Sequence, residues 1–399
     1  MKIGIIRERK TPPDRRVVFS PEQLKDLSKK YDDLSFVVEP SPIRIFPDEH
    51  YKKAGIKVNE DLTDCDILLG VKEVPIDNLI PDKQYFFFSH TIKQQPYNRQ
   101  LLQEILKKNI TLYDHEVIKS EEGLRLVGFG RYAGLVGAYN GLRAYGKRHQ
   151  LFNLPRAEQM EDLKALKEQL DTIELPNCKI LLTGKGKVAK GAKEILDHLN
   201  IREVSVEDYL HHEFGETVFC QIGVREYNRP KNMRSFSFEE FVQHPEKFES
   251  NFKRFAQRTD LFIAGHFHAD GAPYLFTRED AKGKYFRINT IADISCDIDG
   301  PVASTIRPSS IAHPFYGYHP QREEEVAFDD PEAITVMAVD NLPCELPRDA
   351  SEGFGQMFAE HVIPAFFNND KNGILQRAKM TENGQLTKNF SYLQDYVRE

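Results

Sequence analysis

Short apolar runs alternate with charged, amphipathic runs along the first third of the chain. The apolar runs are IGII, FVVE, DILLGVKE, YFFFSH and ITLYDHE, at residues 3–6, 36–39, 66–73, 85–90 and 110–116. Apolar runs of this kind, bounded by polar residues, predict buried strands. A helix is predicted to begin after Ser20, because serine caps a helix, proline suits its first turn and Gln23 can reach back to the cap. A second helix is predicted for 98–109. Strands separated by helices favour a mostly parallel, doubly wound sheet.

A second alternation of the same kind begins at Lys179. Its predicted strands are KILLTG, EVSVED, DLFIAGHF, RINTIADI and ITVMAVD, at residues 179–184, 203–208, 260–267, 287–294 and 334–340, with a helix over 188–199. Small residues at helical spacing predict a long, closely packed helix over 131–150. Residues 209–258 form a charged, aromatic insert of open role, and 350–367 are expected to be helical. The predicted fold class is therefore α/β, with two doubly wound parallel-sheet domains and the active site in the cleft between them.

Composition narrows the class of protein. The 399 residues suit two domains, and the net charge of −7 disfavours non-specific binding to nucleic acid. The chain contains no apolar run long enough to span a membrane, and its N-terminal segment lacks the pattern of a signal peptide. Five scattered cysteines without a CxxC pair favour reduced thiols and a cytoplasmic protein. His266 and His268 alone make a poor metal site, so no metal is expected.

The most informative local motif is TGKGKVAKG, at residues 183–191. It follows a predicted strand and opens a predicted helix, which is the context of a dinucleotide-binding turn. Gly184 allows the tight turn, Gly186 lets the backbone approach a diphosphate, and Ala189 fits the small position where helix and strand pack. The free N–H groups of the helix N-terminus then face the phosphates. The alternative is a tight turn that binds no ligand. The motif indicates a Rossmann-like domain that binds NAD or NADP.

An acidic residue at the end of the second strand is expected to bind the adenosine ribose. Glu207 and Asp208 stand about 20 residues after the glycines, and a carboxylate there favours NAD. The alternative is that both are solvated loop charges. Nearby cations offer a site for a 2′-phosphate instead: Arg202, His211 and His212. The sequence therefore leaves the choice between NAD and NADP open.

Ionisable residues end two predicted strands of the first half: Lys72 in GVKEVP and His90 in FFFSHTIK. Ligands bind at the carboxyl ends of strands in open parallel sheets, and a partly desolvated lysine or a histidine can exchange protons near neutral pH. The alternatives to a catalytic role are an ion pair of Lys72 with Glu73 and a purely structural role for His90. Arg16 is a candidate to bind a substrate carboxylate through two parallel hydrogen bonds. The alternative is an ordinary arginine on the surface. The further candidates, each with a structural alternative of similar weight, are Glu116, Arg125, Asp293 and Asp297.

Six blocks occur in one order along the chain: GVKEVP, FFFSHTIK, LVGFGRYAGLVGA, GKGKVAKG, IADISCDIDG and AVDNLPCELPRDASEGFG. Together they resemble the alanine dehydrogenase/transhydrogenase N-domain superfamily, and within it the saccharopine dehydrogenases. Three longer segments resemble the lysine–ketoglutarate reductase half of the bifunctional lysine-degrading enzyme: FFFSHTIKQQPYNRQLLQEILKKNITLYDHE, HPEKFESNF and IAHPFYGY. The resemblance covers residues 1–365.

The resemblance implies a domain organisation and a set of site residues. Residues 1–135 and 345–399 would form the substrate domain, with the dinucleotide-binding domain, 136–344, inserted between them. It makes Lys72 and His90 the catalytic acid–base pair and gives Asp297 a catalytic place near the nicotinamide. The substrate-binding residues would be Arg16, Lys93, Glu116, Arg125 and Arg131, although Arg131 departs from the family pattern and has a structural alternative. The implied cofactor-binding residues are Gly184, Gly186, Ala189, Glu207, Asp208, Asp293, Asp340 and Leu342.

The function predicted from the resemblance is a saccharopine dehydrogenase-type oxidoreductase acting on a CH–NH group. It would join lysine and 2-oxoglutarate with NAD(P)H, reversibly. The first alternative is an alanine dehydrogenase that uses pyruvate, ammonia and NADH. The second is a non-catalytic nucleotide-binding or transhydrogenase-like subunit. The expected partners are a small amino acid or 2-oxo acid and a possible second copy of the chain, with no nucleic acid or membrane.

Overall fold

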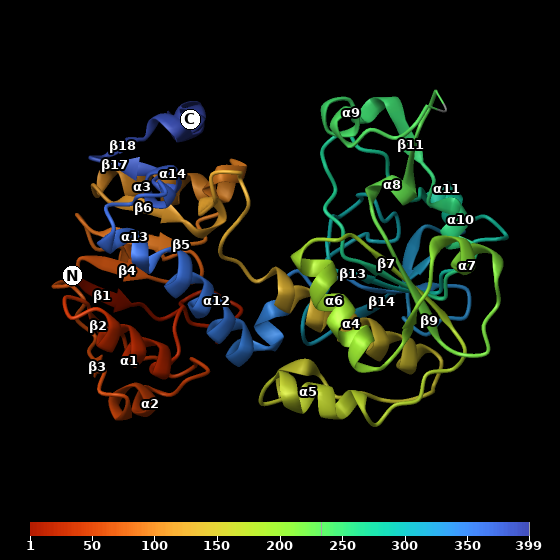
Figure 1. Ribbon diagram of the computed structural model, residues 1–399, viewed down its shortest axis with the longest axis horizontal. Coiled ribbons are helices and arrows are strands. Elements are labelled where there is room, and N and C mark those ends of the chain that lie inside the picture. Colours follow the sequence, from red (N-terminus) through yellow and green to blue (C-terminus); the bar gives the residue numbers. More distant parts are fainter. Residues whose placement is uncertain (233, 399) are drawn as a thin grey trace. The chain divides into compact units, whose positions relative to one another are not determined.

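The computed structural model describes residues 1–232 and 234–398, and it divides into two compact units (Figure 1). One unit comprises Met1–Phe129 and Pro347–Glu399, and the other comprises Gly130–Leu346. Residues 233 and 399, which fall within the predicted insert and the predicted C-terminal part of the first domain, lie outside the described residues. Each unit is built around one large sheet flanked by helices, so the predicted α/β class with two sheet-based domains is confirmed.

The sheet of the first unit has six parallel strands in the order β3-β2-β1-β4-β5-β6. The strands are β1 (Lys2–Ile5), β2 (Ser35–Val38), β3 (Lys57–Val58), β4 (Ile67–Leu69), β5 (Gln84–Phe87) and β6 (Thr111–Asp114). Nearly all residues of the four central strands are buried, as expected for a parallel sheet covered on both faces. Each predicted strand exists, but β4 and β5 end earlier than predicted, so Lys72 and His90 lie in the loops that follow them.

The helices of the first unit come from both ends of the chain. They are α1 (Pro21–Lys30), α2 (Asp48–Lys53), α3 (Arg99–Lys107), α12 (Pro347–His361), α13 (Ile363–Phe367), α14 (Ile374–Ala378) and α15 (Gln394–Arg398). The predicted cap of α1 is confirmed, because the side chain of Ser20 accepts from the Gln23 backbone and Gln23 reaches back to the Ser20 N–H. Figure 1 shows α12 in blue beside the red and orange N-terminal elements. The ring of Phe358 on α12 lies 5.5 Å from that of Phe86 on β5, so the C-terminal segment is part of this core.

The second unit contains an eight-stranded sheet in the order β15-β14-β16-β13-β12-β7-β9-β8. The strands are β7 (Lys179–Thr183), β8 (Arg202–Glu203), β9 (Val218–Ile222), β12 (Leu261–Ala264), β13 (Thr290–Asp293), β14 (Phe315–His319), β15 (Glu324–Val326) and β16 (Ile334–Met337). The sheet is parallel, as predicted, except at one edge, where β14 and β15 run antiparallel. The aromatic run of β14 lies between a proline and a short polar turn that leads into β15. The two strands form a hairpin, which requires no crossover helix.

The neighbour of β7 differs from the one that the sequence predicts. The predicted second strand, 203–208, is only the two-residue edge strand β8, followed by α7 (Val206–His211). The place beside β7 is taken by β9, which lies inside the predicted insert and pairs with β7 along five residues. Four of the five β9 residues are buried, whereas both residues of β8 are exposed, so burial of apolar surface favours this order. The rest of the insert contains α8 (Val224–Tyr227), the hairpin β10 (Asn228–Pro230) and β11 (Phe248–Ser250), α9 (Phe238–Gln243) and α10 (Lys253–Ala256).

Two helices of the second unit pack unusually closely. They are α4 (Gly130–Arg148) and α6 (Lys187–His198). A Cβ atom on Gly134 would lie 1.9 Å from the Val188 carbonyl oxygen, and one on Gly191 would lie 2.0 Å from the Arg131 carbonyl oxygen. The predicted close packing of the long helix is therefore confirmed. The other helices of this unit are α5 (Leu163–Leu170) and α11 (Arg278–Ala281). Among the described residues, the model contains no helix that is both long and apolar enough to cross a membrane.

Candidate active site

The loops after β4, β5 and β6 carry the predicted acid–base and substrate-binding groups of the first unit. Lys72 follows β4, His90 follows β5 and Glu116 follows β6. The carboxyl ends of parallel strands meet at one edge of the sheet, so the three groups share the edge where open α/β sheets bind ligands. The structure therefore brings to one edge residues that lie up to 44 positions apart in the sequence (116 − 72).

His90 is held by a partly buried carboxylate. Its Nδ1 atom lies 2.6 Å from Oε1 of Glu73, whose Oε2 also accepts a hydrogen bond from Lys10 at 3.0 Å. Burial acts to raise the pKa of Glu73, but the hydrogen bond and charge of His90 outweigh it, and the pKa falls to about 2. An ionised Glu73 can only accept a hydrogen bond, so Nδ1 of His90 donates to it, and Nε2 is the other ring nitrogen that can give or accept a proton. His90 also has a φ of 55°, an uncommon conformation for a residue with a side chain.

Lys72 lies beside two carboxylates that the sequence analysis did not identify as site residues. The backbone N–H groups of Val71 and Lys72 donate to the carboxylate of Glu8 at 2.7 and 2.8 Å. Burial, reinforced by the charge of Asp14, raises the pKa of Glu8 to about 7. Lys72 also acts electrostatically on Asp14, so its ammonium group lies near that carboxylate. Glu8 could have been identified as a site residue from the sequence, because it is an acidic residue in the loop after the first strand.

Arg16 is buried and bound to a carboxylate within the unit. Only 3% of the residue is exposed, and its Nε and Nη2 atoms donate to Asp14 at 3.0 and 2.6 Å. Burial opposes ionisation of Asp14, but the Arg16 guanidinium outweighs it and lowers the pKa of Asp14 to about 2. The guanidinium carbon of Arg16 lies 4.3 Å from the centroid of the Phe129 ring. The surface-arginine alternative is therefore wrong, and Arg16 is fixed in position before any substrate arrives.

The remaining predicted groups of this unit are arranged less tightly. Arg125 donates to Glu116 at 3.1 Å, and the Glu116 N–H donates to Asp114. Asp114 also accepts from the backbone and side chain of Ser89, so one buried carboxylate joins the loops after β5 and β6. Lys93 is exposed in the 3-10 turn Thr91–Lys93.

The glycine turn of the second unit has the geometry that the motif predicts. Gly184 has a φ of +96°, Gly186 caps the N-terminus of α6, and Ala189 is fully buried against Gly265. A Cβ atom on Gly186 would meet nothing within 4 Å, so the space above this backbone is open. An open space over a glycine at the N-terminus of a twelve-residue helix fits a diphosphate group. The residues present therefore fit a dinucleotide.

His266 lies next to this turn, and the sequence analysis considered it only as a poor metal ligand. It is 7% exposed, and its Nδ1 atom lies 2.7 Å from the Thr183 hydroxyl. Its Nε2 atom is buried and has no hydrogen-bond partner in the described part of the chain. Burial lowers the pKa of His266 to about 4, so the ring is neutral and can give or accept one further hydrogen bond.

The other predicted cofactor residues occupy two kinds of position. Asp293 is fully buried at the end of β13, where it accepts from the side chain of Ser295 and the hydroxyl of Thr305, each at 2.6 Å. It therefore supports the loop that carries the exposed Asp297. Asp340 is exposed, whereas Leu342 is 2% exposed and lies against Gly137 of α4, which indicates a packing role.

Arg131 and the predicted ribose-binding carboxylates do not lie where the sequence predicted. Arg131 forms a two-pronged ion pair with Glu194 of α6, at 3.0 Å from Nε and 2.9 Å from Nη2. This arrangement favours the structural alternative for Arg131. Glu207 and Asp208 lie in the exposed helix α7 after the edge strand, and Asp208 bonds to Ser205 and His212. Their predicted position at the end of the strand beside β7 is wrong.

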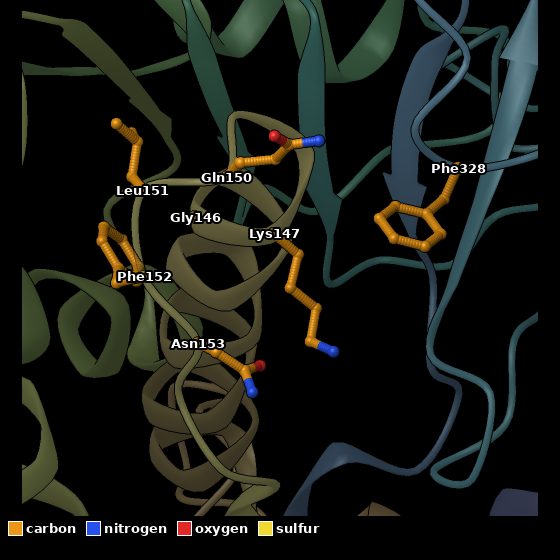
Figure 2. A pocket seen from close by; sticks show the side chains of 7 residues that line it. All are labelled: Gly146, Lys147, Gln150, Leu151, Phe152, Asn153 and Phe328. Atoms are coloured by element: carbon orange, nitrogen blue, oxygen red, sulfur yellow. The ribbon is translucent and has the colours of Figure 1, made fainter.

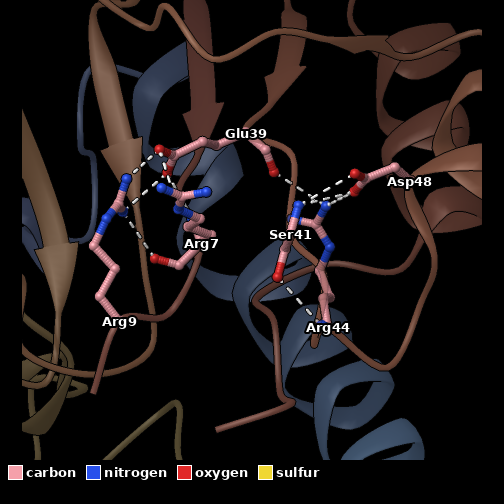
Figure 3. Close-up of polar contacts among 6 residues, drawn as sticks. All are labelled: Arg7, Arg9, Glu39, Ser41, Arg44 and Asp48. Atoms are coloured by element: carbon pink, nitrogen blue, oxygen red, sulfur yellow. Dashed lines mark hydrogen bonds and ion pairs between the residues drawn. The ribbon is translucent and has the colours of Figure 1, made fainter. Parts of the chain in front are cut away.

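Two surface hollows lie within single units, and none of the predicted site residues lines them. One hollow, of about 460 Å³, lies at the end of α4, and Figure 2 shows the side chains that line it, with Lys147 on α4 and Phe328 on the opposite side. The other, of about 260 Å³, is lined partly by Arg9 and Glu39 of the first unit. Figure 3 shows how Arg9 and the Arg7 backbone bind the Glu39 carboxylate, while Arg44 bonds to Asp48. These arginines neutralise the carboxylates of Glu39, which follows β2, and of Asp48, which begins α2.

Known proteins resemble the whole chain. It is 28% identical over 96% of its length to the alpha-aminoadipic semialdehyde synthase, mitochondrial, of Mus musculus, and 28% identical over 98% to the alpha-aminoadipic semialdehyde synthase of Arabidopsis thaliana. It covers only 46% and 41% of those two proteins, so it spans less than half of their length. It is also 24% identical over 90% of both chains to the saccharopine dehydrogenase [NAD(+), L-lysine-forming] of Yarrowia lipolytica.

The fold is shared with solved structures of low sequence identity. An L-alanine dehydrogenase matches with a TM-score of 0.68 at 16% identity and covers all of both chains. A transhydrogenase from Sinorhizobium meliloti matches with a TM-score of 0.53 at 15% identity, over 97% of this chain and 99% of that one. The model of the alanine dehydrogenase/PNT N-terminal domain matches residues 4–136. The matched part contains the Lys72 and His90 loops, and its similarity to this domain family agrees with the resemblance that the sequence motifs indicated.

Proposed function

We propose that the chain is a pyridine-nucleotide-dependent oxidoreductase of the saccharopine dehydrogenase type. In the reductive direction, lysine, 2-oxoglutarate, NAD(P)H and a proton give saccharopine, oxidised cofactor and water. The observation that carries the proposal is the sheet edge that holds Lys72 and the His90–Glu73 pair, in a chain similar over nearly its full length to proteins named for this chemistry.

The arrangement of these groups suits the proton transfers that the reaction needs. The lysine ε-amine attacks the keto carbon of 2-oxoglutarate, and the resulting carbinolamine must lose water before reduction. His90, with Nδ1 held by Glu73, would move these protons through Nε2. Lys72 would be the second acid–base group, with Glu8 fixing its backbone and Asp14 close to its ammonium group. A bound nicotinamide supplies the hydride.

Two ion-paired arginines of the first unit, the buried Arg16 and the exposed Arg125, favour anionic substrates. Arg16 is fixed by Asp14, and Arg125 pairs with Glu116 near the same loops. Arginine has five N–H donors, so either guanidinium can donate to a substrate carboxylate while it keeps its ion pair. A site for lysine and 2-oxoglutarate must hold three carboxylates, so more than one such cation is needed.

The experiment is to follow the loss of NAD(P)H absorbance with purified protein. Oxidation should require lysine and 2-oxoglutarate together, and Lys72→Met should lower kcat by about 10²- to 10⁴-fold without changing the unfolding temperature. Lys164→Met, at a lysine whose side chain is 84% exposed, is the matched control and should leave kcat unchanged. Activity with pyruvate and ammonia alone would identify an alanine dehydrogenase instead. Full activity of folded Lys72→Met would remove Lys72 from the mechanism.

A further inference from the structure

The strand order of the second unit changes which residues border the glycine turn, where the adenosine end of a dinucleotide would bind. The predicted strand 203–208 does not lie beside this turn, whereas β9 does. Strand β9 pairs with β7 from Lys179–Val218 to Thr183–Ile222. The Gly184 N–H donates to the Ile222 carbonyl, and the Gln221 side chain donates to the Gly184 carbonyl, each at 2.8 Å. Gly223, which follows β9, and the first three residues of α8 (together the turn 223–226) therefore border the glycine turn directly.

Residues at the end of the strand beside the glycine turn distinguish the two cofactors. A carboxylate there bonds to the ribose hydroxyls of NAD, whereas a nearby arginine accommodates the 2′-phosphate of NADP. Here the first residue after β9 is Gly223, which has no side chain. The carboxylate of Glu226 is turned back onto the Gly223 N–H, with Oε2 at 2.6 Å. The turn thus lacks an outward carboxylate at the strand end itself.

Two cations flank the same turn. The Cε atom of Lys185 would lie 3.1 Å from a Cβ atom on Gly223, so the lysine side chain extends over this glycine. Arg225 is exposed, and its guanidinium carbon lies 5.7 Å from the centroid of the Phe236 ring. Phe236 belongs to the segment between β10 and α9, so this contact gives the insert a role in positioning Arg225.

We propose that the turn 223–226 recognises the 2′ position of the adenosine ribose, and that Arg225 and Lys185 bind a 2′-phosphate there, so that the chain takes NADP(H) in preference to NAD(H). A guanidinium matches the geometry of a phosphate group, and Lys185 adds a second positive charge. Glu207 and Asp208, one strand further from the glycine turn, do not contact the cofactor. The inference rests on the proposed function only in requiring that the chain binds a pyridine nucleotide.

The test compares adenosine fragments that differ only in the 2′-phosphate. Binding of 2′,5′-ADP and of 5′-AMP to the full chain is measured by calorimetric titration, without substrate or turnover. The wild type should bind 2′,5′-ADP about 10- to 100-fold more tightly than 5′-AMP, as expected for one charge-assisted contact. Arg225→Ala should remove most of this ratio by weakening 2′,5′-ADP alone, and Arg225→Lys should restore part of it.

Matched controls separate this turn from other charges of the unit. Arg229→Ala removes a nearby exposed arginine that pairs with Glu249, and it should leave the ratio unchanged. Asp208→Asn should also leave it unchanged. Equal affinities of the wild type for the two fragments, or a changed ratio in Asp208→Asn, would overturn the inference. Fragment discrimination without lysine-dependent turnover would sink only the proposed function, whereas lysine-dependent turnover without discrimination would sink only the assignment of the turn.

Discussion

Glu345 offers a direct measure of what a buried carboxylate does to the second unit. It ends the 3-10 turn Leu342–Glu345, is 1% exposed, and accepts a hydrogen bond from the Asn140 side chain of α4 at 2.9 Å. Burial raises its pKa from the ordinary 4.5 to about 7. Glu345→Gln keeps the shape and an acceptor oxygen for Asn140 but removes the charge.

The sign and size of the effect follow from proton linkage. The folded protein holds the proton of Glu345 more tightly than the unfolded chain, so stability falls as pH rises from 4.5 through 7. A difference of about 2.5 pKa units corresponds to about 3 kcal/mol at pH 8, since each unit is worth about 1.4 kcal/mol. Glu345→Gln should therefore be up to about 3 kcal/mol more stable than the wild type at pH 8, and equal to it at pH 4.5 and below.

Differential scanning calorimetry at pH 8 and pH 4.5 measures this difference. In a unit of this size, 3 kcal/mol corresponds to a rise of about 6–12 °C in the Tm of its transition at pH 8. Glu332→Gln, at a side chain that is 82% exposed, is the control and should leave Tm unchanged. Glu345→Gln with a lower Tm than the wild type at pH 8 would refute the reasoning, because it would mean that the ionised carboxylate stabilises the fold.

Two further predictions test the packing and the titration of single residues. Gly134→Ala should destabilise the second unit by at least about 1–3 kcal/mol, because its Cβ would lie 1.9 Å from the Val188 carbonyl oxygen; Gly215→Ala, with nothing within 4 Å, should leave Tm unchanged, and equal Tm values for both variants would contradict the close packing of α4 and α6. Burial lowers the pKa of His115 from 6.5 to about 4, so the contribution of His115 to the stability of the first unit should fall by about 2 kcal/mol between pH 7.5 and pH 5 as the unfolded chain takes up the proton. The raised pKa of Glu8 in the same unit acts in the opposite direction, so the test compares variants. Denaturant titrations followed by circular dichroism should show that His115→Gln is stabilised by about 2 kcal/mol relative to the wild type on going from pH 7.5 to pH 5, whereas exposed His50→Gln behaves like the wild type; the same pH dependence in His115→Gln and in the wild type would contradict the assignment to His115.

Local patterns in the sequence were enough for the strands of the first unit and for the glycine turn. The cap at Ser20 and the backbone of Gly184 depend on residues within a few positions, so their chemistry can be recognised in a short window. Lys72 and His90 were predicted at the ends of strands, because an ionisable residue there follows an apolar run, and they lie in the loops after β4 and β5.

The partners of those residues were decided by tertiary structure. Glu73 binds His90 across 17 positions, and Glu8 binds the Lys72 backbone across 64. No spacing rule identifies such pairs, because they form only when separate strands lie side by side. The same reason explains why the sequence left Arg131 open between a substrate carboxylate and a structural role. In the structure it pairs with Glu194 of α6.

The sequence by itself determined the strands of the first unit, the strands β7, β12, β13 and β16 of the second, that the chain has two sheet-based parts, and where the glycine turn lies. Only the tertiary structure decided that β9, and not β8, lies beside β7. The strand order depends on how much apolar surface each strand buries against its neighbours, and the buried run of β9 prevails over the exposed residues of β8. That choice determines which side chains border the glycine turn, and it replaces Glu207 and Asp208 with the turn that carries Arg225.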